Sequence, residues 1–208
     1  MTKPLFVLFL LIACGCNTSS TQKPVKSISI KDSIISKIID HYKQEYKNTA
    51  EMEKENSDTS VLITFNSLPT KEDTSRNFLL SATILKNDSA FISGDLNNDK
   101  SDEILVSVNT EGGGGGGNIW WNDIFIFQNA DGNLTLLCSV ESPEICGCKE
   151  GYFYPSKIEN GLIVGKSICY GEDDPHCCPS LEYDSKLKFV TNKIIFQEKA
   201  NLKKIKTE

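Results

Sequence analysis

The sequence predicts a mainly β fold, an antiparallel meander that forms a sandwich or a partly open barrel, with one N-terminal amphipathic helix. Two observations support this prediction. From residue 60 onward, short runs rich in β-branched and aromatic residues alternate with turn signals. Residues 32–55, in contrast, place apolar side chains at helical spacing. Of the 208 residues, 39% are hydrophobic and 24% are charged, which is the composition of a folded domain.

The first 13 residues have the pattern of a signal peptide. Lys3 is followed by an apolar run over residues 5–12, LFVLFLLI. Such a run is too short to cross a bilayer but is typical of the core of a signal peptide. Residues 14–31 are rich in Ser, Thr and Lys, so we expect a flexible tether there.

The apolar run ends in Leu11-Ile12-Ala13-Cys14, which resembles the bacterial lipobox. The resemblance implies a lipoprotein with palmitate or related chains on Cys14, attached to a membrane of the bacterial cell envelope. More than one acyl chain gives stable anchoring. Because Gly15 and not Asp follows Cys14, the resemblance implies the outer membrane if the host has one. Cys16 is a weaker rival site, and an ordinary signal peptide is the alternative.

The helix predicted over residues 32–55 has one apolar stripe. Its members are Ile34, Ile35, Ile38, Ile39, Tyr42 and Tyr46. Asp32 or Ser33 can cap its start. The polar side carries charges of both signs, so we expect the stripe to pack on the domain and not to face a membrane or a partner.

Eight strands are expected in a β-rich domain over residues 60–200, followed by a polar tail over residues 201–208. The expected strands are residues 61–65, 78–85, 103–108, 122–127, 134–140, 161–170, 180–190 and 193–197. Turn signals at Asp131-Gly132, Asn160-Gly161 and Thr191-Asn192 join neighbouring strands, so we expect local antiparallel pairing.

A loop rich in oxygen side chains precedes the expected strand 103–108. Its sequence over residues 94–103 is GDLNNDKSDE. A tight loop can fold such a series around one Ca²⁺, which prefers six to eight oxygen ligands. The ligands would be Asp95, Asn97, Asp99 and Glu103 through their side chains and Ser101 through its carbonyl. The alternative is an Asx-rich turn without metal.

This loop resembles the D-x-N-x-D-G-x-x-D loops of FG-GAP and VCBS-type repeats, which also precede an apolar strand. The resemblance implies calcium binding by the same residues. Lys100 stands where those loops have glycine, and Glu103 stands where they have Asp. If the position of Lys100 requires a positive φ, a lysine there costs about 1 kcal/mol or more.

Eight cysteines indicate an oxidising compartment. Six of them lie close together and are disulfide candidates: Cys138, Cys146, Cys148, Cys169, Cys177 and Cys178. We expect local bridges, from Cys138 to Cys146 or Cys148 and from Cys169 to Cys177 or Cys178, while sequence cannot choose the pairing. A strained vicinal bond between Cys177 and Cys178 is a further alternative. The alternative is a zinc site that also uses His176, although the spacing differs from that of common structural sites.

The stretch DPHCCPS over residues 174–180 resembles the D-P-x-C-C-P-S signature of secreted bacterial proteins of unassigned function, including the LppP/LprE-type lipoproteins. In several of these proteins the signature follows an aspartate-rich loop and a Gly-rich hairpin, in the order seen here. The resemblance covers about residues 90–197. It implies a β-rich extracytoplasmic domain and no particular activity.

Six glycines over residues 112–117 are followed by Trp120 and Trp121. A phosphate-binding loop would need a Lys-Ser/Thr pair and a following helix, which are absent, so we expect a long hairpin connection. Adjacent tryptophans on a strand point to opposite faces. We therefore expect one to be in the core and the other to be exposed, as in a sugar- or protein-binding surface.

A net charge of −6 disfavours nucleic acid as a partner, and two histidines leave little room for a Ser/His triad. We predict a non-enzymatic, membrane-anchored envelope lipoprotein with a disulfide-stapled, calcium-binding β-domain. Its role would be binding or accessory, and its partner an unknown protein or polysaccharide. The alternative is an envelope hydrolase that uses Glu172, Asp173 and Asp174, for which the sign would be a deep pocket holding two carboxylates with displaced pKa values.

Overall fold

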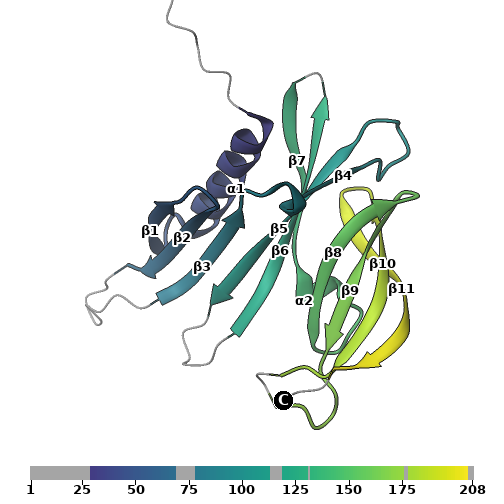
Figure 1. Ribbon diagram of the computed structural model, residues 1–208. Coiled ribbons are helices and arrows are strands. Elements are labelled where there is room, and N and C mark those ends of the chain that lie inside the picture. The colour runs from purple at the N-terminus through teal and green to yellow at the C-terminus, as the bar shows by residue number, and fades with distance from the viewer. Residues whose placement is uncertain (1–28, 69–77, 113–118, 131, 176–177, 206–208) are drawn as a thin grey trace, which may run out of the picture.

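A computed structural model describes residues 29–68, 78–112, 119–130, 132–175 and 178–205 (Figure 1). These residues form three layers: helix α1 (Ile30–Tyr46), a seven-stranded antiparallel sheet and a four-stranded antiparallel sheet. The predicted mainly β, sandwich-like fold with one long helix near the N-terminus is confirmed. Within the described residues, no helix combines the length and the apolar character needed to cross a membrane.

The larger sheet has the strand order β1-β2-β3-β5-β6-β7, and β4 pairs with β5 beside this path. Its strands are β1 (Ala50–Asn56), β2 (Ser60–Ser67), β3 (Phe78–Leu85), β4 (Phe91–Gly94), β5 (Glu103–Gly112), β6 (Ile119–Ala130) and β7 (Asn133–Glu141). Two strands share one edge of β5: β4 pairs with residues 103–106 and β3 with residues 109–112. This arrangement places β3 beside the end of β5 that leads toward the tryptophans.

The smaller sheet has the order β11-β10-β9-β8. Its strands are β8 (Gly151–Glu159), β9 (Leu162–Cys169), β10 (Leu181–Val190) and β11 (Lys193–Lys204), and the short helix α2 (Ser142–Ile145) connects it to β7. A 3₁₀ turn, η1 (Asp88–Ala90), precedes β4. Two of the three expected turns, at residues 160–161 and 191–192, are confirmed, since all four residues have positive φ, as a type I′ hairpin turn requires. Asp131, in the third, lies outside the described residues.

Two hydrophobic cores lie on the two faces of the larger sheet. Phe125 and Phe127 of β6 pack with α1, whereas Ile124 and Ile126 pack against the smaller sheet. All four are fully buried, because β6 is covered on both faces. The apolar stripe of α1 packs on the domain as expected, with Ile38 fully buried.

The predicted helix over residues 32–55 is too long. The helix begins after Ser29, whose hydroxyl accepts a hydrogen bond from the backbone N–H of Asp32 at 3.1 Å, and ends at Tyr46. Residues 50–56 form β1 instead, paired with β2 along its whole length. Pairing with a neighbouring strand overrides the helical preference of its Glu, Met and Lys side chains.

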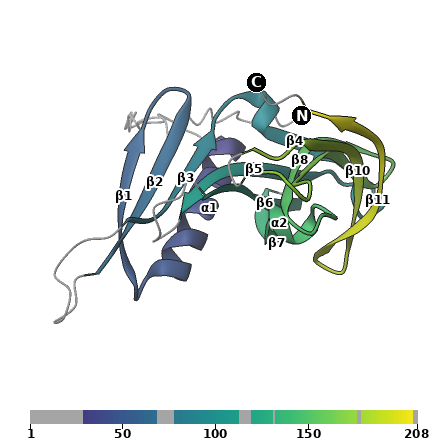
Figure 2. The ribbon, with the colours of Figure 1, turned by 90° about the horizontal axis from the view of Figure 1, so that it is seen from below.

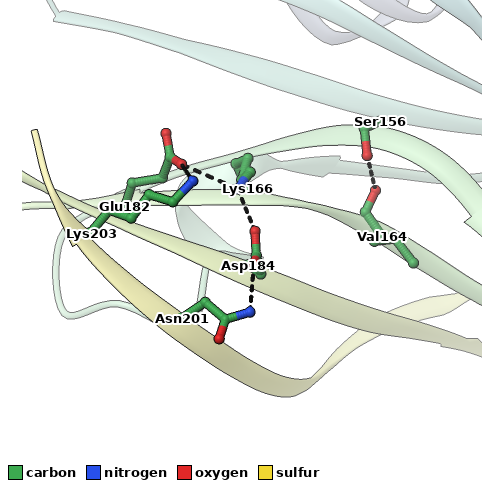
Figure 3. A network of polar contacts seen from close by, with 7 residues as sticks. All are labelled: Ser156, Val164, Lys166, Glu182, Asp184, Asn201 and Lys203. Atoms are coloured by element: carbon green, nitrogen blue, oxygen red, sulfur yellow. Dashed lines mark hydrogen bonds and ion pairs between the residues drawn. The ribbon is translucent and has the colours of Figure 1, made fainter.

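Three further strand predictions need correction. Strands β4 and β8 were not expected, and β11 extends to Lys204, into the segment expected as a polar tail. β8 contains Pro155, next to which the pairing with β9 shifts register, and Ser156 donates a hydrogen bond to the Val164 carbonyl at this bulge. Figure 3 shows this contact beside a polar network on β9, β10 and β11.

That polar network lies at the surface of the smaller sheet. Lys166 of β9 forms ion pairs with Asp184 and with Glu182, the latter at 3.2 Å, and the Asn201 side chain donates to Asp184 at 2.8 Å (Figure 3). The hydrogen bond from Lys166 lowers the pKa of the Asp184 carboxyl. The network lies at the surface, so we expect it to contribute little to stability.

The two sheets diverge at one end of the molecule. In Figures 1 and 2, β1, β2 and β3 extend to one side, away from the strands of the smaller sheet. Helix α1 packs on one face of these three strands. We call their other face, together with the adjoining end of β5 and β6, the open face.

Candidate functional site

Among the pockets of the described surface, one lies on each face of the larger sheet. The first, here called the aromatic pocket, lies on the open face and has a volume of about 330 Å³. It is lined by Ser81, Thr83, Asn109, Thr110, Glu111, Trp120, Trp121 and Tyr154. The second, here called the acidic cleft, lies beside α1 and has a volume of about 400 Å³. It is lined by His41, Tyr42, Gln44, Glu45, Tyr46, Leu80, Trp121, Asp123, Ser139, Val140, Glu141 and Glu144.

Strand register brings the polar residues of the aromatic pocket together. Ser81 of β3 lies opposite Glu111 of β5, which lies opposite Trp120 of β6. Thr83 lies opposite Asn109 in the neighbouring row. Side chains opposite each other on one face are about 5 Å apart at Cβ, so these residues form a continuous surface.

Trp120 and Trp121 point to opposite faces of the sheet, as expected. Trp120 is 39% exposed and stacks on Tyr152 of β8, with ring centroids 4.6 Å apart and planes at 19°. Trp121 packs against the core under α1 and donates its indole N–H to Asp123 at 2.9 Å. A side chain at Gly112 would come within 2.8 Å of the Trp121 ring, so this glycine makes room for it.

Four polar side chains of the aromatic pocket have no partner within the described residues. Ser81, Thr83, Asn109 and Glu111 form no side-chain hydrogen bond or ion pair to another described residue. No Lys or Arg lines the pocket in this part of the chain. Hydroxyls, an amide and one carboxylate are therefore available for a ligand.

The acidic cleft is centred on a buried carboxylate. Asp123 is 8% exposed and accepts hydrogen bonds from the hydroxyl of Tyr42, the indole of Trp121 and the hydroxyl of Thr110. Burial raises the pKa of the Asp123 carboxyl despite these three donors. Burial and the adjacent Asp123 carboxylate likewise raise the pKa of the Tyr42 hydroxyl.

A second carboxylate of the acidic cleft faces Asp123. Glu141 lies directly opposite Asp123 in the pairing of β6 with β7. Burial raises the pKa of the Glu141 carboxyl, and the negative charges of Asp123, Glu144 and Glu45 raise it further. Like charges in opposite positions destabilise a sheet, so this pair is unfavourable for the fold alone. His41 also lines the cleft, with Nε2 3.2 Å from the Ser139 hydroxyl.

The aspartate loop uses its side chains to hold its own backbone. Asp95 accepts hydrogen bonds from the N–H groups of Asn98 and Lys100, at 2.7 and 3.0 Å. Asn97 accepts from the N–H of Asp99, and Asp99 from the N–H of Ser101. Lys100 does adopt a positive φ, of 72°. These Asx turns bring the expected metal ligands into one small loop.

Glu103 is the buried member of the loop. Its carboxylate is fully buried and accepts from the backbone N–H of Leu96 at 2.8 Å and from the Asn97 amide at 3.1 Å. Burial raises the pKa of the Glu103 carboxyl, and Asp99 and Asp95 raise it further. Among the described residues, no three His, Cys, Asp or Glu side chains are placed to hold a metal ion together.

The cysteines do not form the local bridges that the spacing suggested. Cys148 is bonded to Cys169, with 5.7 Å between their Cα atoms, and Cys178 is disulfide-bonded as well. Cys138 and Cys146 are free thiols. The β8–β9 hairpin places Cys169 beside the start of β8. The Cys146 side chain, in contrast, is buried in the core between the two sheets.

The carboxylates proposed for the alternative hydrolase do not form a catalytic pair. Asp174 accepts from the backbone N–H groups of Gly171 and Ser180, and the Gly171 bond lowers the pKa of its carboxyl. Glu172 and Asp173 are exposed. Asp174 thus stabilises a turn. Cys14, Cys16, His176 and Cys177, together with the glycines 113–117, lie outside the described residues.

Sequence reasoning missed the acidic cleft and most of the aromatic pocket. Asp123 was visible as a lone carboxylate at the start of an apolar strand, which is a signal for a buried charge. Ser81 and Thr83 carried no signal, because their neighbours depend on β3 pairing with β5 across the skipped strand β4.

No protein-family model matches the chain, and no curated protein or solved structure matches it either. Its function is therefore inferred from the residues of these sites.

Proposed function

We propose that this protein is a non-enzymatic binding protein of the bacterial cell envelope, anchored to a membrane through a lipid on Cys14. The ligand side would be the open face, at the aromatic pocket. Support for the anchor comes from the resemblance of residues 11–14 to a lipobox, and from eight cysteines in a chain with a signal-peptide pattern.

One observation carries the binding role. The aromatic pocket combines a partly exposed tryptophan with four polar side chains that have no partner in the described residues. Polar groups left available in a concave aromatic site are what a binding pocket requires. Among the described residues that line this pocket, Glu111 is the one carboxylate, whereas acid–base hydrolysis uses a pair.

A cross-linking experiment in cells tests this function. A benzoylphenylalanine at position 109, on the open face, is expected to form adducts in the membrane fraction after irradiation. The same residue at position 37, on the exposed side of α1, is the control and should form few. The Cys14→Ser variant should leave the membrane fraction and lose palmitate labelling. An equal yield of adducts at the two positions, or no adduct at position 109, would contradict a ligand on the open face.

The proposal includes calcium in the aspartate loop, held by Asp95, Asn97, Asp99, Glu103 and the Ser101 carbonyl. Calcium that binds only the folded state stabilises it by RT ln(1 + [Ca²⁺]/Kd), because the unfolded chain has no such site. Millimolar calcium is therefore expected to raise the melting temperature of the full chain by several degrees above that in EDTA.

The matched control for calcium is Asp99→Asn, which keeps the shape of the side chain and removes one negative charge. It should melt at the same temperature with calcium and with EDTA. Magnesium should act more weakly, since it demands an octahedral site with retained waters. A wild-type melting temperature that does not respond to calcium would show that the loop is only a set of Asx turns.

A second candidate function, an envelope hydrolase, is favoured by one observation. Among the described residues, four carboxylates line the acidic cleft, and the pKa values of two of them, Asp123 and Glu141, are raised. Against it, Asp123 already accepts three hydrogen bonds, which is typical of a structural carboxylate. Release of reducing ends from envelope polysaccharide, lost in Glu141→Gln, would favour this function over binding.

A further inference from the structure

The wall of the aromatic pocket is a fixed aromatic surface. Trp120 is stacked on Tyr152, and the Tyr152 hydroxyl lies 3.0 Å from that of Tyr170, so the stack is held from behind. Tyr154 adds a third ring, 6.4 Å from Trp120 and tilted by 39°. The face of an aromatic ring carries negative charge density, which attracts weakly positive C–H groups laid flat upon it.

The floor of the pocket offers hydrogen bonds of both kinds. Ser81 and Thr83 can each donate and accept, the Asn109 amide does both, and Glu111 accepts. All four are unpartnered within the described residues. A ligand with many hydroxyl groups can match such a mixture, because each hydroxyl also donates and accepts.

The charge of the open face selects against anionic ligands. Glu111 is the one carboxylate among the lining residues, and no Lys or Arg lines the pocket in the described chain. The row of Ser81 and Glu111 continues through Thr64 on β2 to Glu53 on β1. Glu53 adds an exposed carboxylate at the β1 end of this row, and its charge, like that of Glu111, repels uronic acids, phosphates and nucleic acids.

The size and shape of the pocket suit a small ring better than a protein surface. Its volume of about 330 Å³ is at the lower end of the range for ligand pockets. A protein interface needs a broad apolar centre, whereas this floor is made of hydroxyl, amide and carboxylate groups.

We propose that the aromatic pocket binds a pyranose ring of a neutral polysaccharide, with the ring stacked on Trp120 and its hydroxyls bonded to Ser81, Thr83, Asn109 and Glu111. This inference rests on the proposed binding function and names its ligand class. The neighbouring sugars of the chain lie along the row that crosses β3 and β2 toward β1.

Calorimetric titration of the full chain tests the proposal, in a detergent without a sugar headgroup. The probes are cellohexaose and chitohexaose, and oligogalacturonate of the same length is the charged control. At least one neutral hexasaccharide is expected to bind saturably with a millimolar or lower Kd, and the charged control is expected to bind more weakly. Failure of both neutral sugars to bind would overturn the proposal.

Paired variants locate the binding. Trp120→Ala is expected to weaken binding at least about tenfold, since it removes the stacking surface. Thr83→Val keeps the volume of the side chain and removes one hydroxyl, so the affinity is expected to fall about threefold to tenfold. Thr135→Val makes the same change at an exposed position of β7, opposite Gln128 and outside the pocket, and should leave the Kd unchanged. Unchanged binding in both Trp120→Ala and Thr83→Val would also overturn the proposal.

The experiments distinguish failure of the binding function from failure of the saccharide as its ligand. If position 109 forms a discrete, protease-sensitive adduct in cells and neither hexasaccharide binds, the binding function stands and the saccharide is wrong. If position 109 forms no adduct and no sugar binds, both are wrong. A polydisperse adduct that resists protease, together with sugar binding lost in Trp120→Ala, supports both.

Discussion

Replacing Asp123 with alanine is expected to lower the free energy of unfolding by about 3–5 kcal/mol. The carboxylate accepts hydrogen bonds from Tyr42, Trp121 and Thr110, three side chains on α1, β6 and β5. Its loss leaves three donors without their acceptor, at about 1–3 kcal/mol for each that stays buried. Urea unfolding at neutral pH measures this change.

Glu144→Ala is the control, because this exposed side chain lines the same cleft; its effect should stay within about 0.5 kcal/mol. A loss below about 1 kcal/mol in Asp123→Ala would mean that water replaces the carboxylate. In that case Asp123 would not link the helix to the sheet.

The pH dependence of stability gives an independent check on Asp123. Its pKa is raised in the fold, so between the ordinary carboxyl pKa of about 4 and the raised value the folded chain binds more protons than the unfolded chain. Stability therefore falls as pH rises through this window. Glu103 and Glu141 act in the same direction. In the Asp123→Asn variant, the decrease in the free energy of unfolding from pH 5 to pH 8 should be smaller than in the wild type.

Removing the bond between Cys148 and Cys169 is expected to lower stability by about 3 kcal/mol, because it frees a loop closed over a separation of 21 residues in the unfolded chain. The double variant Cys148→Ser with Cys169→Ser is the cleaner test. In a single variant, the thiol of Cys146 could form a new bridge, since it lies 3.3 Å from the backbone nitrogen of Cys148.

Cys138→Ser is the control for the disulfide, because this thiol is free and half-buried. It should change stability by less than half as much as the double variant. If wild type and double variant unfold at the same denaturant concentration, the bond does not constrain the unfolded chain. Wild type in reducing agent should then also behave like the oxidised protein.

Alternating or helical apolar patterns made the cores predictable. The stripe that contains Ile38 was placed correctly, and strand 122–127, which carries Phe125 and Phe127, was expected, because burial on one face imposes a period that the sequence must carry. β8 carried a weaker pattern, because Pro155 and a bulge interrupt it.

The candidate sites were less predictable, because they depend on pairing between distant strands. Trp120 was visible as half of a tryptophan pair, and the loop from Asp95 to Glu103 as a series of oxygen side chains. Thr83 acquired its role only through register with Asn109, and Asp123 through its contact with Tyr42, 81 residues away. Local sequence does not contain such information.

Strand β1 has a consequence for the behaviour of many copies of this protein. It is an edge of the larger sheet, and its outer backbone groups could pair with another chain. Its sequence AEMEKEN has three glutamates and one lysine. Charged side chains along an edge oppose strand-by-strand growth into fibrils, because a second copy would bring the same charges together. The charged residues of β1, which led to its prediction as part of a helix, therefore protect the sheet from aggregation.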